Sequence, residues 1–148
     1  MQPDFKDFLK ESARHLNIAD HMTHVTFPIV NEKRLILKIF EEIYKSIMNS
    51  INFAVLNRFT NNEIESNLFY FIDSISKKIN LDENNIKKIK EIMEIENKYK
   101  KSAMNFVKKD KIVILSDSLA IHTLTIENIK EYLLIAKELF MNVSNSKK

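Results

Sequence analysis

The residues whose types could support chemistry gather near the start of the chain, where Arg14, Asn17, His21 and His24 follow one another at short intervals. On a helix, these intervals place the four side chains along one edge, with Arg14 and His21 about 20° apart on the helical wheel. An imidazole can move protons near neutral pH, and a guanidinium can hold a phosphate. The pattern fits a polar catalytic site, but a solvated helix face is its commoner meaning.

Other histidines allow further interpretations. Asp20, His21 and His24 together make a ligand set of two imidazoles and one carboxylate, but no remote ligand can be identified to complete a site. We therefore predict neither a metal site nor a cofactor. His15 falls on the apolar side of the same helix and is predicted to be a core histidine with one hydrogen-bond partner, whereas His122 has no identifiable local partner.

A basic segment from Lys98 to Lys111 is the second candidate site. It holds six lysines against the single acidic residue Asp110, namely Lys98, Lys100, Lys101, Lys108, Lys109 and Lys111. Tyr99 and Phe106 are interleaved, so the segment could contact phosphates while Tyr99 stacks on a base. The alternative is a lysine-rich helix end, which the helix dipole favours, followed by a solvated loop.

Two residue types are missing from the 148-residue chain, and their absence excludes several classes of protein. Without glycine, neither a P-loop nor a dinucleotide-binding turn can form, because both need backbone that only glycine supplies cheaply. Helix ends must then use asparagine or lysine, and two-residue hairpin turns are disfavoured. Without cysteine, disulfides, thiolate zinc sites and cysteine nucleophiles are excluded. The net charge of +3 permits an anionic partner.

Hydrophobic periodicity predicts a mainly α fold, a bundle of about five helices with a small β-hairpin before the last helix, in one domain covering residues 1–148. The first helix should end before Pro28, and Asn31 should cap a second helix that runs to about Arg58. The second helix carries the broadest apolar stripe, which marks it as the central helix: Ile36, Ile39, Phe40, Ile43, Ile47, Ile51 and Ala54.

The remaining elements follow from local signals. A third helix is expected from about Ile64 to Ile79, a fourth after the N-cap Asp82, and a last one after the N-cap Thr125 with a frayed tail from Asn142. The hairpin strands are expected at 111–115 and 120–124. No apolar run approaches the ~20 residues of a membrane span, and the first residues lack an apolar signal core, so we expect a cytoplasmic protein with no membrane partner.

The segment Phe8–His21, together with the apolar stretch Ile43–Ile47, resembles the opening of a HEPN domain, a helical superfamily of nucleotide-binding proteins and ribonucleases. Active members carry an arginine and a histidine a few residues apart, and here six residues separate Arg14 from His21. The resemblance implies that Arg14 positions a phosphate and that His21 acts as acid or base. The second half is similar to small helical proteins of archaea, which implies a fold and no activity; this rests on Ser102, Met104, Phe106, Lys109–Lys111, Val113–Ile114 and Thr125–Glu127.

Taken together, these observations favour a non-enzymatic interaction module, either a monomer or a homodimer, that binds RNA or a partner protein through the basic segment 98–111. The alternative is a HEPN-like, metal-independent endoribonuclease that uses Arg14 and His21, with Asn17 beside them. A third class is a structural subunit or antitoxin-like partner whose exposed apolar residues are covered in a complex.

Overall fold

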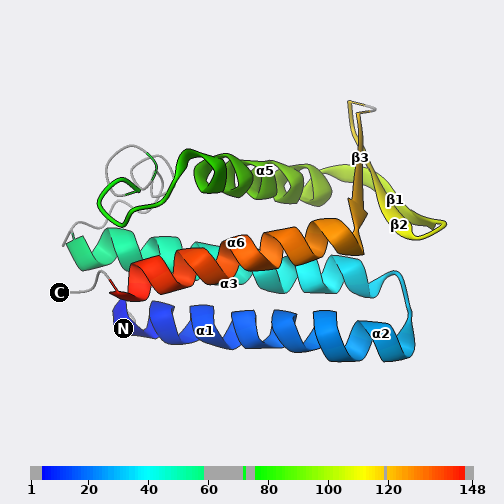
Figure 1. Cartoon of the computed structure of the whole chain (residues 1–148). Coiled ribbons are helices and arrows are strands. Elements are labelled where there is room, and N and C mark those ends of the chain that lie inside the picture. The colour runs from blue at the N-terminus through cyan, green and yellow to red at the C-terminus, as the bar shows by residue number, and fades with distance from the viewer. Residues whose placement is uncertain (1–4, 59–71, 73–75, 119, 146–148) are drawn as a thin grey trace.

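The computed structural model of the chain describes residues 5–58, 72, 76–118 and 120–145. It is mainly helical, as the sequence predicts, with four long helices packed side by side and an antiparallel sheet at one end of them (Figure 1). The long helices are α1 (Phe5–His21), α3 (Leu35–Arg58), α5 (Glu83–Lys100) and α6 (Ile126–Asn145). The sheet contains, in spatial order, β1 (Ser102–Lys108), β2 (Lys111–Ser116) and β3 (Ile121–Thr125). The helix expected from Ile64 to Ile79 lies almost wholly outside the described residues.

The chain stays helical through Pro28, so the prediction that the first helix ends before this proline is wrong. After α1, a π-helical turn, η1 (Met22–Thr26), leads directly into α2 (Phe27–Val30), with Pro28 in its first turn. The N–H of Phe27 bonds to the Met22 carbonyl, five residues back, so the usual four-residue ladder is already interrupted where Pro28 lacks a donor. Asn31 is consequently the left-handed C-cap of α2, with φ 54°, and not the N-cap of the next helix.

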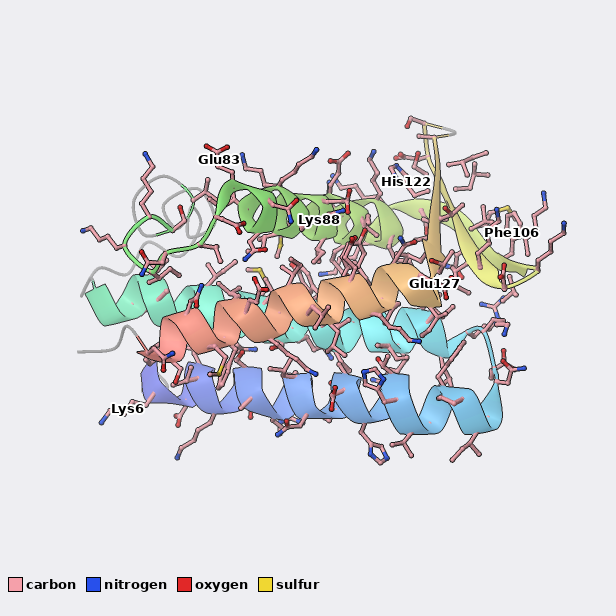
Figure 2. All side chains as sticks on the ribbon, in the orientation of Figure 1. Lys6, Glu83, Lys88, Phe106, His122 and Glu127 are labelled. Atoms are coloured by element: carbon pink, nitrogen blue, oxygen red, sulfur yellow. The ribbon has the colours of Figure 1, made fainter. Side chains whose placement is uncertain are left out.

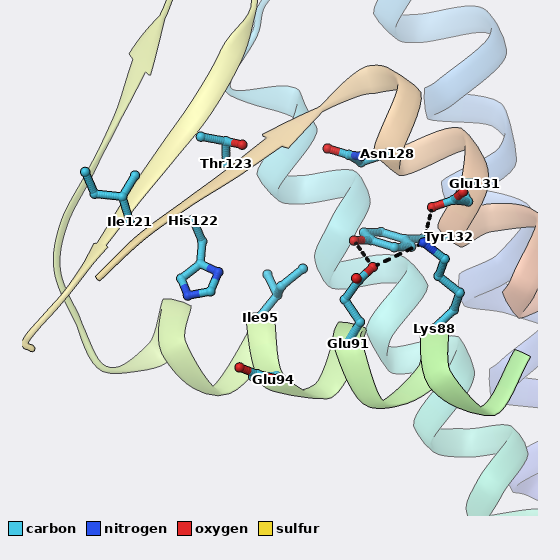
Figure 3. Close-up of a pocket in the computed structure, with 10 residues that line it drawn as sticks. All are labelled: Lys88, Glu91, Glu94, Ile95, Ile121, His122, Thr123, Asn128, Glu131 and Tyr132. Atoms are coloured by element: carbon cyan, nitrogen blue, oxygen red, sulfur yellow. Dashed lines mark hydrogen bonds and ion pairs between the residues drawn. The ribbon is translucent and has the colours of Figure 1, made fainter. Parts of the chain in front are cut away.

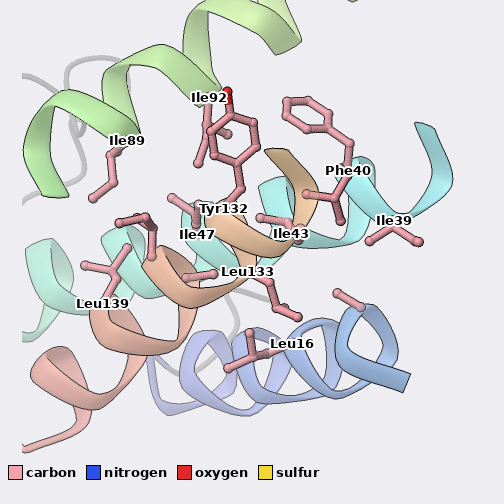
Figure 4. Close-up of a cluster of buried hydrophobic side chains, with 14 of the residues drawn as sticks. Leu16, Ile39, Phe40, Ile43, Ile47, Ile89, Ile92, Tyr132, Leu133 and Leu139 are labelled. Carbon is pink, nitrogen blue, oxygen red and sulfur yellow. The ribbon is translucent and has the colours of Figure 1, made fainter. Parts of the chain in front are cut away.

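The central helix α3 packs against α1, α5 and α6, and its predicted apolar stripe is buried throughout. Figure 4 shows how side chains of α5 and α6 close over this stripe, with the ring of Tyr132 edge-on to Phe40. Small polar side chains allow α1 and α3 to approach closely. Ser12 donates through Oγ to the Ser46 carbonyl at 2.8 Å, and Ser46 donates back to the Ser12 carbonyl at 2.9 Å. One buried cluster joins all four long helices and the sheet.

Two predicted helix caps are confirmed. The backbone N–H of Asn85 donates to Asp82 Oδ1 at 2.8 Å at the start of α5, and that of Asn128 donates to Thr125 Oγ1 at 3.1 Å at the start of α6. Both contacts satisfy N–H groups that a helix leaves open in its first turn. The tail predicted to fray from Asn142 instead remains helical to Asn145.

The predicted hairpin is present as β2 and β3, but β1 joins it to make a three-stranded sheet. The connection between β1 and β2 is a two-residue turn, since Lys108 pairs with Lys111. This turn corrects the expectation that a chain without glycine avoids such turns. Lys109 takes the left-handed conformation there, with φ 57°, as Asn31 and Asn80 do elsewhere. Among the described helices, none combines the length and the apolar character needed to cross a bilayer.

Candidate functional site

The edge formed by Arg14, Asn17 and His21 is open surface on α1, because all three side chains are exposed. Arg14 is held by Glu11 through two contacts, Nε to Oε2 at 3.1 Å and Nη2 to Oε1 at 2.9 Å. The hydrogen bond to Arg14 lowers the pKa of Glu11 below its ordinary value. Arg14 and His21 are about 10 Å apart along the helix axis, given the rise of 1.5 Å per residue. One α1 helix therefore does not place both groups on a single phosphate.

The histidine that Arg14 contacts is the buried His15, and not His21. Arg14 Nη2 lies 3.2 Å from His15 Nε2, and His15 Nδ1 lies 2.7 Å from Glu42 Oε1. Because a guanidinium can only donate, Nε2 must accept and Nδ1 must carry the proton that it donates to Glu42. The prediction that His15 is a core histidine is confirmed, and its neutral ring connects a buried carboxylate to a surface guanidinium.

Asp20 and His24 are used by other contacts. Lys137 Nζ donates to Asp20 Oδ1 at 2.7 Å and ties α6 to α1, while His24 Nε2 is 3.7 Å from the same oxygen. Across the described residues, no three potential metal ligands of the His, Cys, Asp or Glu type converge. Asp20, His21 and His24 are therefore side chains on the surface of one helical segment, and Asp20 also contacts α6.

The basic segment is divided by the fold, and its helical part is already engaged. Lys98, near the end of α5, pairs with Glu94 at 3.0 Å and donates to His122 Nε2 at 2.8 Å. Lys100 points to another side of α5, where its Nζ lies 5.8 Å from the centre of the Tyr44 ring. Tyr99 is only partly exposed, and burial, together with the carboxylates of Glu41 and Glu96, raises the pKa of its hydroxyl.

The other lysines lie at the far end of β1. That strand rises about 3.4 Å per residue, so roughly 24 Å of backbone separates Lys101 from Lys108. Lys108, Lys109 and Lys111 surround the turn between β1 and β2, and none of them pairs with an acidic side chain within the described part of the chain. The basic segment therefore contains two separate groups of lysines, one at the end of α5 and one at the turn between β1 and β2. The lysines at the turn have no acidic partner among the described residues.

These turn lysines border an exposed apolar surface, which we call the outer sheet face. Directly paired residues of an antiparallel sheet point to the same side. The register therefore gives one face three rows across the strands: Met104–Leu115–Ile121, Phe106–Val113–Thr123 and Lys108–Lys111–Thr125. Met104, Phe106 and Ile121 are 52%, 38% and 66% exposed. The opposite face buries Ile112, Ile114 and Leu124 against the helices.

Sequence reasoning missed this face because it treated residues 102–108 as a loop. The available signal was the alternation of Met104, Phe106 and Lys108 with Asn105 and Val107, which is the period of a strand. In Figure 2, Phe106 lies on the hairpin, beyond the ends of α5 and α6.

A polar cleft of about 510 Å³ lies between α5, β3 and the start of α6. Figure 3 shows a connected set of side chains on its floor: Tyr132 donates its hydroxyl to Glu91 Oε2 at 2.7 Å, and Lys88 bridges Glu91 at 3.7 Å and Glu131 at 3.0 Å. The hydrogen bond to Glu131 raises the pKa of Lys88. The polar groups of this set are partners of one another, and their contacts hold α5 against α6.

His122 faces the same cleft from β3 (Figure 3). Its Nε2 accepts from the Lys98 ammonium, so the ring is neutral with its proton on Nδ1. Sequence analysis identified no partner for His122 because Lys98 lies 24 positions away on another element. Sequence alone does not show that these two residues meet.

No protein-family model matches the chain, and neither a curated protein nor a solved structure matches it. The resemblances to HEPN domains and to small archaeal proteins therefore remain predictions.

Proposed function

We propose that this protein is a single-stranded RNA-binding module whose contact surface is the outer sheet face. The observation that supports the proposal is the position of Phe106 and Met104, exposed on one sheet face beside the unpaired lysines 108, 109 and 111. A base can stack on an exposed aromatic ring, and neighbouring cations can hold the phosphates on either side of it.

The spacing between the rows of the outer sheet face allows a base to stack on Phe106 while the neighbouring lysines contact phosphates. Alternate residues of a strand are about 7 Å apart, so the lysine row lies one such step from the row that contains Phe106. A lysine side chain easily spans that distance, and its ammonium is free to turn toward a phosphate. The helical lysines of the segment contribute less, because Lys98 is already bound to Glu94 and His122.

The test compares two charge-matched double variants in their binding to a fluorescently labelled single-stranded RNA. Lys108→Glu with Lys111→Glu reverses the lysine row, and Lys87→Glu with Lys90→Glu makes the same charge change on the exposed surface of α5. The sheet variant keeps its fold, because Lys108 and Lys111 already form a like-charge pair. We expect only the sheet variant to lose binding.

Phe106→Ala separates stacking from charge. Stacking of a base on an aromatic ring is worth about 1–3 kcal/mol, so this variant should bind roughly tenfold more weakly while its salt dependence is unchanged. The lysine variant should instead flatten the salt dependence, since each lost phosphate contact reduces the slope by about 0.7. Equal loss of affinity in the α5 control, or wild-type affinity in Phe106→Ala, would refute the proposal.

The same RNA, examined by gel electrophoresis, tests the endoribonuclease prediction. Cleavage by the wild type that disappears in His21→Ala would support catalysis by Arg14 and His21. Intact RNA after prolonged incubation with binding-competent protein would count against it.

A further inference from the structure

A second cavity, of about 310 Å³, lies between α3 and α5, away from the outer sheet face. Its walls are two tyrosine rings, Tyr44 on α3 and Tyr99 on α5, with a carboxylate from each helix, Glu41 and Glu96. A volume of this size is at the lower end of the range of small-molecule sites.

Glu96 is the unusual residue of this cavity. Its side chain is 5% exposed, and its Oε2 has no hydrogen-bond partner anywhere in the described chain. A buried carboxylate without a partner is costly, and such oxygens are normally satisfied by a protein group, a water or a ligand. Burial raises the pKa of Glu96, with a smaller contribution from the charge of Glu41. A cation bound in the cavity beside the Glu96 carboxylate would reduce this cost.

The chain's own lysines show which kind of group the cavity attracts. The Lys100 ammonium lies 5.8 Å from the centre of the Tyr44 ring, which is within cation–π range. Lys100 is an exposed residue on a long, flexible stem, so it can swing into solvent. Lys45 also lines the cavity, but its ammonium is 3.9 Å from the Glu42 carboxylate and is shared with that group.

From these contacts we propose that the cavity between α3 and α5 binds an organic ammonium ion, held by the Glu96 carboxylate and the rings of Tyr44 and Tyr99. Lys100 occupies part of this site when the ligand is absent and leaves when it binds. The proposal does not depend on RNA binding, because none of the cavity's residues belongs to the outer sheet face.

The residues favour an organic cation over other ligands. Two carboxylates supply too few oxygens for a calcium ion, which takes six to eight. A simple anion could pair with Lys45 or Lys100, which also line the cavity, but it would leave the buried Glu96 carboxylate oxygen without a partner. Aromatic walls beside a carboxylate are instead the arrangement that recognises quaternary and alkylated ammonium groups.

Tetramethylammonium chloride is the probe for the test, titrated into the full chain while the tyrosine ring signals are followed by NMR. Sodium chloride at equal ionic strength controls for salt, and tert-butanol controls for shape without charge. We expect saturable shifts of Tyr44 and Tyr99 with tetramethylammonium alone, at a Kd of about 1–10 mM as suits a weak monovalent ligand.

Variants then identify the groups responsible. Glu96→Gln should weaken binding about tenfold or more, since the negative charge that attracts the cation is lost. The Glu96→Gln variant should keep its fold, because the neutral amide places no charge at this buried position. Glu94→Gln is the matched control, as it lies about 200° away on α5 and faces the polar cleft.

Lys100→Ala should bind the probe several-fold more tightly than the wild type, because it removes the internal competitor. Tyr44→Leu should bind several-fold more weakly, because it keeps the volume and loses the ring. The proposal is overturned if the probe causes no saturable shift, if tert-butanol or sodium causes the same shift, or if Glu96→Gln binds as the wild type does. RNA binding by the outer sheet face should be unchanged in Glu96→Gln.

Discussion

Replacing His15 with alanine should destabilise the protein strongly, because it leaves the buried Glu42 carboxylate without its main partner. Glu42 is 3% exposed, and the His15 ring donates to its Oε1 at 2.7 Å. A hydrogen bond to a charged group is worth about 1.5–3 kcal/mol, and a buried carboxylate that loses such a partner keeps the cost of its desolvation. Lys38 and Lys45, at 3.4 and 3.9 Å from the other oxygen, soften the loss.

We therefore expect His15→Ala to lower the free energy of unfolding by about 2–3 kcal/mol, which lowers Tm by about 5–10 °C for a chain of this size. Urea unfolding monitored by circular dichroism measures the free energy. His21→Ala is the matched control, because His21 is exposed on the same helix, and it should change stability by less than about 0.5 kcal/mol. The double-mutant cycle with Glu42→Ala should give a coupling of about 1.5 kcal/mol or more.

The effect should depend on pH in a defined direction. Burial by itself raises the pKa of Glu42, but the His15 hydrogen bond and the charges of Lys38 and Lys45 hold it below its ordinary value of 4.5. A carboxyl with a lowered folded-state pKa stabilises the fold above its unfolded pKa and loses that contribution as the pH falls through the folded value. The difference between wild type and His15→Ala should accordingly shrink below pH 4.5. A His15→Ala variant as stable as the His21→Ala control, or a difference that stays constant down to pH 3, would refute this account of the pair.

Three smaller predictions concern other parts of the fold, each measured by urea unfolding. Asp82→Ala should cost about 1 kcal/mol, since it removes the acceptor of the Asn85 N–H at the start of α5; Asp117→Ala, on an exposed residue outside any helix, should have no such effect. Lys109→Gly should stabilise the protein by up to about 1 kcal/mol, because glycine takes the left-handed φ of 57° without strain, and a loss of stability would contradict this. Ile47→Ala should cost about 2–4 kcal/mol, because Ile47 is fully buried in the centre of α3, and a cost below 1 kcal/mol would show that the core repacks freely.

Helical periodicity predicted the long helices well because burial on one side is a repeating constraint. The α3 stripe lies in the core, and the caps Asp82 and Thr125 begin the expected helices. These features depend on residues three or four positions apart in the chain. Such local patterns can be recognised in a single sequence. The error at Pro28 was also local in origin: a rule against helix before proline overlooked that α2 restarts after a π-helical turn, with the proline in its first turn.

The sheet and the cavities were harder to predict because they depend on residues far apart in the chain. The strand period of β1 is short and lies in a lysine-rich segment, so it was overlooked, and the pairing of β1 with β2 is visible only in the fold. The cavity between α3 and α5 requires knowing that Tyr44 faces Tyr99, and no local pattern gives this. Buried pairs such as His15 with Glu42 are equally invisible, although the apolar position of His15 indicated that it needed a partner.

The lysines of segment 98–111 show why the charge of a sequence is not the charge of a surface. In the sequence they form one basic run. In the fold, Lys98 contacts the Glu94 carboxylate and the His122 imidazole, and the Lys100 ammonium lies over the Tyr44 ring. Substituting these two would disturb α5 and its cavities, so a loss of RNA binding in such variants would be ambiguous. The turn lysines lie at the tip of the β1–β2 hairpin and pair with no acidic side chain of the described residues, so their charge can be reversed with little effect on the core. Charge reversal at the turn therefore reports on a binding surface, whereas charge reversal at Lys98 and Lys100 reports mainly on the fold.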